Sequence, residues 1–218
     1  MTVPGIPNLV DLYVHAKEVN AGKASLQGGY SETEGFLYGA SVSEPNFLGT
    51  GKYVSLSFQR SQLATSVSVG YNNPFYTISG ISRGFSLYYT RTKPSSNINI
   101  DNSYTVDNFG GEMYYGIPVS DYDTLSAGFG YDHIIISNVN LNTIAAGPLA
   151  FLIQHGFNPN NPNSVELNQL HVTGGWTHAT LDRAVFPTHG SVNVFGVTIG
   201  PGIFGKSANY YKITYQGR

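Results

Sequence analysis

Histidine is the residue type in this chain that is best suited to metal binding or acid–base chemistry. The six histidines are His15, His133, His155, His171, His178 and His189. No HExxH pair occurs and the chain has no cysteine, so no zinc ligand set is formed. His171 and His178 are seven residues apart on one expected strand, and therefore should face opposite sides.

A second group of candidate residues surrounds one expected turn. His178, Asp182 and His189 lie near it, and Ser191 could complete a Ser-His-Asp set. No G-x-S-x-G elbow supports a serine nucleophile, so polar residues at the end of a strand are the better interpretation. Gly49-Thr50-Gly51 lacks the Gly-Lys-Ser/Thr of a phosphate loop. We expect no catalytic residues, no metal site, no cofactor and no enzyme.

The composition limits the class of protein. The 218 residues include only 11% charged residues, against roughly 25% in soluble domains, and 13% aromatic residues. The longest apolar run, Pro148 to Ile153, is too short for a transmembrane helix. A net charge of −2 offers no basic surface to nucleic acid. Few charges, many tyrosines and short apolar runs fit a membrane β-barrel, in which only alternate residues face lipid.

The hydropathy pattern has a period of two, which predicts strands. Ten are expected near residues 23–30, 35–43, 52–60, 63–72, 81–91, 104–117, 123–136, 166–180, 190–199 and 209–215. Most are about as long as a tilted strand that crosses a bilayer. Before them, Leu9–Val19 alternates differently and is expected to be a strand of a soluble domain.

The connections between the expected strands alternate in character. The second, fourth, sixth and eighth are compact and rich in Pro, Gly and aromatic residues, whereas most of the others are longer and polar. Outer-membrane barrels have short periplasmic turns and longer extracellular loops, so the chain should enter from the periplasm. Within the longest loop, 137–165, residues 147–156 have the pattern of a short helix, with an unstructured loop as the alternative.

Strict alternation also predicts which side chains face lipid. Residues expected to point outward are Val67, Val69, Tyr71, Met113, Tyr115, Ile117, Leu125, Ala127, Phe129 and Tyr131. Residues expected to point into the lumen are Glu112, Ser126, Gly128 and Gly130. Glu112 is expected to pair with Arg83 or Arg91. The tyrosines are better explained as aromatic girdles than as sugar-binding platforms. These residues alone do not separate a porin, an adhesin, an usher and an assembly factor.

The sequences of the compact turns resemble those of a known protein family. The motif residues are Asn46, Phe47, Leu48, Gly49 and Gly51, then Asn73, Pro74 and Phe75, then Asp182, Arg183, Pro187 and Gly190. Their order and spacing resemble the BamA family of outer-membrane protein assembly factors. Val10–Val14 with Lys17-Glu18 resembles the last strand of a POTRA domain, and Ala127–Tyr131 and Tyr210–Thr214 resemble strands of the family's barrel.

The resemblance implies an all-β, antiparallel, up-and-down transmembrane barrel of sixteen strands, of which this chain would hold about ten. Residues 1–21 would end the last periplasmic POTRA domain, and residues 22–218 would form the N-terminal part of the barrel. The implied location is the outer membrane, with the N-terminal end in the periplasm. The implied partners are nascent outer-membrane β-barrel proteins, accessory assembly lipoproteins and the lipid bilayer, and the implied role is to fold and insert those barrels.

The resemblance also implies a lateral gate at the first barrel strand. The gate residues would be Lys23, Ala24, Ser25, Leu26, Gln27, Gly28, Gly29 and Tyr30. Glycines weaken a strand and would loosen its pairing, although they could instead only allow close packing against a neighbour. Rival interpretations are a passive channel or adhesin barrel, a related POTRA-barrel translocation protein, and a soluble β-sandwich that binds carbohydrate. The first two rivals differ from the gate hypothesis in function, and the last differs in fold.

Overall fold

A computed structural model describes residues 21–32, 34–93, 104–183, 186–203 and 206–218 of the chain. The strands are β1 (Lys23–Ser31), β2 (Gly35–Glu44), β3 (Tyr53–Arg60), β4 (Ala64–Asn73), β5 (Ser82–Thr92), β6 (Thr105–Pro118), β7 (Asp123–Ser137), β8 (Val165–Ala179), β9 (Val192–Gly200) and β10 (Tyr210–Gly217). A 3-10 turn, η1 (Phe47–Gly49), and one helix, α1 (Ala146–Gln154), complete the elements. All ten strands expected between residues 23 and 215 are present with bounds within two residues of the prediction, and the helix in the long loop is confirmed.

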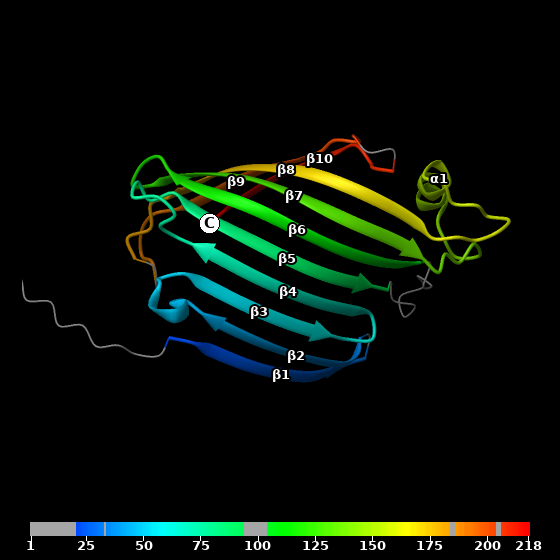
Figure 1. Ribbon diagram of the computed structural model, residues 1–218, viewed down its shortest axis with the longest axis horizontal. Coiled ribbons are helices and arrows are strands. Elements are labelled where there is room, and N and C mark those ends of the chain that lie inside the picture. The colour runs from blue at the N-terminus through cyan, green and yellow to red at the C-terminus, as the bar shows by residue number, and fades with distance from the viewer. Residues whose placement is uncertain (1–20, 33, 94–103, 184–185, 204–205) are drawn as a thin grey trace, which may run out of the picture.

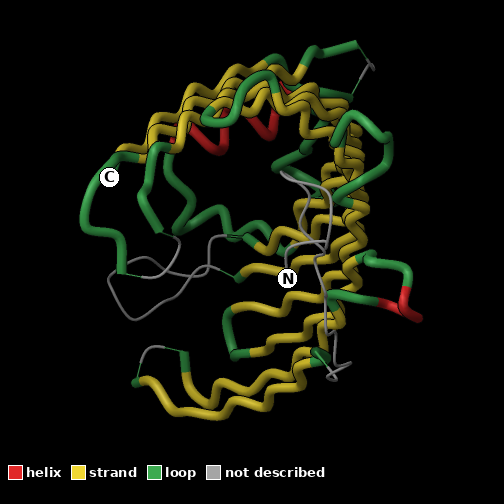
Figure 2. The backbone as a smooth tube through the Cα atoms, turned by 90° about the vertical axis from the view of Figure 1, so that its left-hand side faces the viewer, coloured by secondary structure: helices red, strands yellow, loops and turns green. Residues whose placement is uncertain are grey.

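The ten strands form one antiparallel sheet in sequence order. Figures 1 and 2 show that this sheet curves strongly without closing. Among the described strands, β1 pairs only with β2 and β10 pairs only with β9. The all-β, antiparallel, up-and-down architecture predicted from the sequence is confirmed. The expected soluble strand at Leu9–Val19 lies outside the described residues.

The connections divide the sheet into two rims. The compact connections after β2, β4, β6 and β8 lie at one end of the strands, here called the turn rim, on the left in Figure 1. The other connections lie at the opposite end, the loop rim, together with α1. No helix in the described part of the chain is long and apolar enough to span a membrane.

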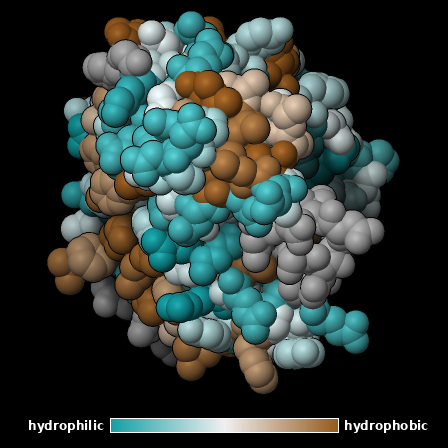
Figure 3. All heavy atoms as spheres, turned by 90° about the vertical axis from the view of Figure 1, so that its right-hand side faces the viewer, coloured by the Kyte–Doolittle hydropathy of each residue, from teal (hydrophilic) through white to brown (hydrophobic). Residues whose placement is uncertain are grey.

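The concave face of the sheet is covered at the loop rim by α1. Leu152 of α1 and Phe157 pack with Val165 and Leu167 of β8, and Ile134 of β7 borders this small core. The helix lies inside the curve of the sheet in Figure 2. Figure 3, which looks onto the loop rim, shows an apolar patch in the upper half of this end with polar surface around it.

The strand register assigns every strand residue to the concave or the convex face, because neighbours in register share a face. Phe129 pairs with Met113 on one side and with Val172 on the other, and these residues lie on the convex face. Charged residues on the convex face of the described strands lie within three residues of a strand end. They are Glu44, Arg60, Arg83, Arg91, Asp107, Asp123 and Glu166. The middle of the convex face is therefore uncharged, as a lipid-facing band requires.

Aromatic residues on the convex face lie in two bands. The band toward the turn rim contains Tyr71, Phe85, Tyr115, Trp176, Phe195 and Tyr215. The band toward the loop rim contains Tyr30, Phe36, Tyr38, Phe58, Tyr89, Phe109 and Tyr211. Two such bands flanking an apolar middle are the arrangement of aromatic girdles at the two membrane interfaces.

Candidate functional site

The edge of β1 is the first candidate site. Its nine residues pair with β2 from Lys23 opposite Ser43 to Ser31 opposite Gly35. The other edge of β1 faces no strand among those described, and Leu26 on this strand is 88% exposed. An unpaired edge carries a row of N–H and C=O groups that can accept a further strand.

Gly28 and Gly29 lie in the middle of this edge strand, where no described side chain or backbone atom excludes a larger residue. A Cβ placed on Gly29 would meet no atom within 4 Å, and one on Gly28 would meet only the Leu37 carbonyl oxygen at 3.9 Å. Among the described residues, no neighbour packs closely enough to require glycine at either position. What remains is their effect on the backbone, since glycine lowers the tendency of a segment to stay in an ordered strand.

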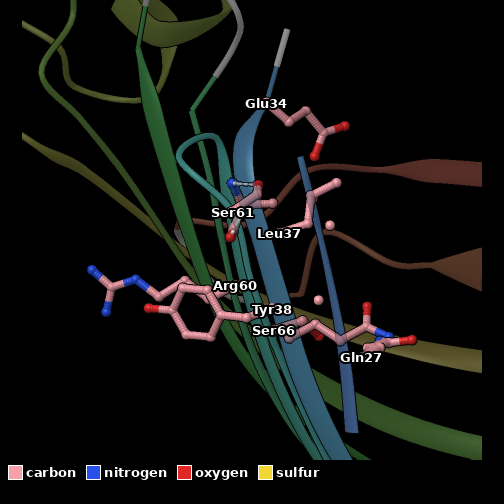
Figure 4. Close-up of a pocket in the computed structure, with 11 residues that line it drawn as sticks. Gln27, Glu34, Leu37, Tyr38, Arg60, Ser61 and Ser66 are labelled. Atoms are coloured by element: carbon pink, nitrogen blue, oxygen red, sulfur yellow. Dashed lines mark hydrogen bonds between the residues drawn. The ribbon is translucent and has the colours of Figure 1, made fainter. Parts of the chain in front are cut away.

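A groove of about 370 Å³ lies beside β1 toward the loop rim (Figure 4). Gln27 from β1, Leu37 and Tyr38 from β2 and Arg60 from β3 contribute to its lining. The loop-rim turns beside it are tied together, because the Gln62 backbone N–H donates to the Glu34 carbonyl at 3.1 Å. Gly28 and Gly29 of β1 also line this groove, so it adjoins the strand that forms the sheet edge.

The concave face holds a polar cluster centred on Asp132 of β7. Tyr88 Oη donates to Asp132 Oδ1 at 2.6 Å, and Asn108 Nδ2 donates to the same oxygen at 3.0 Å. His171 Nδ1 lies 3.0 Å from Asp132 Oδ2, without the alignment of a hydrogen bond. Four consecutive strands, β5 to β8, are thus joined through one buried carboxylate.

Glycines make room for this cluster. A Cβ on Gly110 would lie 2.5 Å from Asp132 Oδ1, and a Cβ on Gly130 would lie 2.3 Å from His171 Nε2. The expectation that Gly130 faces the lumen agrees with this contact, and its position in register with Glu112 and His171 gives the reason. Large polar side chains from one strand cover the glycines of the next.

The prediction that Glu112 pairs with Arg83 or Arg91 is wrong. Glu112 Oε1 accepts a hydrogen bond from Thr173 Oγ1 at 3.1 Å across the concave face. The register places Arg83 and Arg91 on the convex face, where they cannot reach Glu112. Arg91 pairs instead with Asp107, its cross-strand neighbour, with Nη2 3.1 Å from Oδ2.

The first compact turn is held by its own side chains and by positive φ angles. Asn46 Oδ1 accepts the Gly51 backbone N–H at 2.6 Å, and Gly49 and Gly51 have φ of 72° and 69°. Leu48, also in the left-handed region at 53°, is 83% exposed, and Phe47 is exposed as well. The sequence motif therefore builds a turn that projects apolar side chains at the turn rim.

The second compact turn follows β4. Asn73 Oδ1 accepts the Phe75 backbone N–H at 3.2 Å, which forms an Asx turn with Pro74 at its centre. Phe75 is 77% exposed, and Tyr76 covers the guanidinium of Arg83. The stacking of Arg83 was not predicted from the sequence.

The fourth compact turn is organised by Asp182. Its carboxylate accepts the Thr188 hydroxyl at 2.7 Å and the backbone N–H groups of Thr188 and His189 at 2.9 and 3.2 Å. These bonds, the Thr188 hydroxyl first, lower the pKa of Asp182 to about 2. Arg183 Nε also donates to this carboxylate, and Gly190 has φ of 102°. Pro187 lies in the same turn.

The residues of the possible Ser-His-Asp set do not come together in the structure. His178 Nδ1 lies 2.8 Å from Asp123 Oδ1 rather than from Asp182, and the Ser191 backbone N–H donates to Thr180 Oγ1. His171 and His178 face opposite sides, as expected. In the described part of the chain, no three His, Cys, Asp or Glu side chains converge on a possible metal position.

Sequence reasoning missed the Asp132 cluster and the stacked Arg83. The signal for Asp132 was a carboxylate at an inward position of an alternating strand. Its partners lie on other strands, so only the register identifies them.

Comparisons with known proteins agree with this geometry. Residues 46–218 match the model of the Omp85 superfamily domain. Outer membrane protein assembly factor BamA of Neisseria meningitidis is 27% identical over 215 residues, which are 97% of this chain and 26% of that protein. BamA of Buchnera aphidicola is 22% identical over 133 residues, 60% of this chain and 21% of that protein.

A solved structure gives the same result for the fold. The crystal structure of BamA from Haemophilus ducreyi lacking POTRA domains 1–3 superimposes with a TM-score of 0.75 and 25% identity, over 92% of this chain and 37% of that one. The chain thus spans about a quarter of the first relative's length. With most of its residues matched by the family model, this chain forms part of an outer-membrane β-barrel and belongs to the Omp85 superfamily.

Proposed function

We propose that this chain is the N-terminal part of the barrel of an outer-membrane protein assembly factor, with β1 as one side of a lateral gate. The observation that carries the proposal is the outer edge of β1, which faces no strand among those described and holds two glycines that no described neighbour requires. The relatives from Neisseria and Buchnera, which are named assembly factors, support the same activity.

The physical basis is the cost of bare backbone in lipid. Each unsatisfied N–H or C=O group in the bilayer core costs several kcal/mol, so a strand edge there strongly favours another strand. A client strand that adds to β1 would satisfy the row by β-augmentation. No covalent bond forms or breaks in this process, so it requires neither catalytic residues nor a cofactor.

The proposed orientation follows from the connections. The turn rim would face the periplasm and the loop rim the cell exterior, because short turns are periplasmic in outer-membrane barrels. Residues 1–21 would end the last POTRA domain on the periplasmic side, and residues 22–218 would belong to the barrel. The clients would be nascent β-barrel proteins, and accessory assembly lipoproteins would bind on the periplasmic side.

Gly28→Val in the full-length protein tests the gate. Valine favours strand by about 0.5–1 kcal/mol over glycine, and the space at Gly28 admits its Cβ. β1 should then pair more firmly with whichever strand lies beside it, so that gate opening and client release both slow. The measurement is the rate at which the protein, reconstituted in liposomes, inserts a client barrel.

Gly174→Val on β8 is the matched control. Gly174 also lies on the convex face, but in the interior of the sheet, and a Cβ built on it would meet no atom within 4 Å. Client insertion should slow several-fold in Gly28→Val and stay near the wild-type rate in Gly174→Val. Equal rates in the two variants would contradict the role proposed for β1.

A further inference from the structure

We propose that Arg83 and Tyr76 form a binding site for the phosphate of a glycerophospholipid headgroup, on the convex face at the turn rim. Arg83 is the second residue of β5, and Tyr76 lies in the turn that precedes this strand. The proposal rests on the membrane orientation given above, which places this rim at the periplasmic leaflet.

The guanidinium of Arg83 is held by aromatic rings. Its Cζ lies 3.9 Å from the centroid of the Tyr76 ring and 5.2 Å from that of Phe85. Tyr115 packs edge-on against Tyr76, with ring centroids 6.4 Å apart. Cation–π stacking of this kind fixes the plane of the guanidinium without neutralising its charge.

No acidic side chain neutralises Arg83 in the described part of the chain. Its Nε is buried and makes no hydrogen bond. The convex-face residues beside it at the turn rim are Asn73 on β4 and Tyr115 and Ile117 on β6, which carry no charge. Asp123, the acid of β7 at this rim, already binds Ser120, Trp176 and His178.

Arg91, on the same face of the same strand, shows the contrast. It lies near the loop rim and forms a two-point pair with Asp107. The protein thus supplies an anion to one convex-face arginine of β5 and not to the other. No carboxylate of the described residues neutralises Arg83, and its side chain is only partly buried, so its guanidinium is available to an anion from outside.

The surroundings of Arg83 indicate that this anion is a lipid phosphate. Phe75 and Ile78, in the same turn, are 77% and fully exposed, and the Tyr71–Phe85 pair continues the apolar surface toward the middle of the sheet. A glycerophospholipid offers both parts of a matching ligand, since its phosphate would meet the guanidinium while its acyl chains cover the apolar side chains. Arginine at a membrane interface binds phosphate with charge-assisted hydrogen bonds.

The test is native mass spectrometry of the full-length protein in detergent, titrated with dioleoylphosphatidylglycerol. Wild-type protein should retain one more lipid than Arg83→Gln, with an apparent Kd on the order of tenfold lower, as expected for the loss of a charged hydrogen bond. Arg91→Gln, the matched control, should bind like wild type. Dioleoylglycerol, which lacks the phosphate, should not distinguish Arg83→Gln from wild type.

Equal binding of the phospholipid by wild type and Arg83→Gln would overturn the proposal. Displacement of the lipid by millimolar inorganic phosphate would also overturn it, because the site would then bind the free anion. If Arg83→Gln fails to fold, Tyr76→Leu keeps the cation, removes the stacked ring and should weaken binding several-fold. Client insertion is measured separately, so a failure of the proposed assembly function is not confused with the absence of the lipid site.

Discussion

Replacement of Phe129 by arginine should severely impair insertion of the barrel. Phe129 is the seventh of the fifteen residues of β7 and is 53% exposed on the convex face. It is flanked in register by Met113 and Val172, and no charged residue lies in the middle of this face on the described strands. The substitution would thus place a cation where the structure has only apolar neighbours.

The expected size of the effect follows from the depth of this position. Arginine on the lipid face of a barrel near the bilayer midplane costs about 2–4 kcal/mol. At about 1.4 kcal/mol per factor of ten, the folding equilibrium should fall by roughly 25- to 700-fold. Ser126→Arg is the matched variant on the same strand, because Ser126 is exposed on the concave face between Gly116 and Gly175. There the arginine reaches water, and a cost below about 0.5 kcal/mol is expected.

The assay is refolding of the full-length protein from urea into phospholipid vesicles. The folded fraction is measured by heat-modifiable mobility on a gel, and Phe129→Leu serves as the apolar control. Phe129→Arg should lose most of the folded fraction while Ser126→Arg and Phe129→Leu keep it. Equal loss in the two arginine variants, or in neither, would refute the assignment of faces.

Two further predictions concern the turn between β8 and β9. The pKa of Asp182 is lowered to about 2, so its contribution to the turn is complete above its ordinary pKa of 3.8 and is lost as the pH falls through about 2. The protection factors of the Thr188 and His189 amides, which compare the exchange rate with the intrinsic rate at each pH, should therefore stay constant down to about pH 4 and fall below it. A fall that begins near pH 6 would disagree. Gly190→Val should lower the free energy of unfolding of the barrel by at least about 1 kcal/mol, measured by urea titration. The reason is that Gly190 has φ of 102° and that an added Cβ would lie 2.2 Å from the Thr180 carbonyl oxygen. An unchanged midpoint would show that the turn can adopt another conformation.

Local sequence determined the elements of this protein. Alternation with a period of two predicted all ten strands, since a side chain in a strand points to one face or the other regardless of its neighbours. The turn at Asp182 and Gly190 was also predictable, because its hydrogen bonds span only six or seven residues and its glycine meets a local need for positive φ. The same is true of the helix between β7 and β8.

The partners of side chains were decided only by the tertiary structure. Asp132 meets Tyr88 and His171, which are 44 and 39 residues away, because the register brings β5, β7 and β8 to the same level. The predicted pairing of Glu112 with Arg83 or Arg91 failed for the same reason, since charge complementarity does not reveal which face a neighbouring strand presents. Periodicity assigns each residue to a face, but contacts across strands depend on register, which is set by many ladder bonds and turn lengths together.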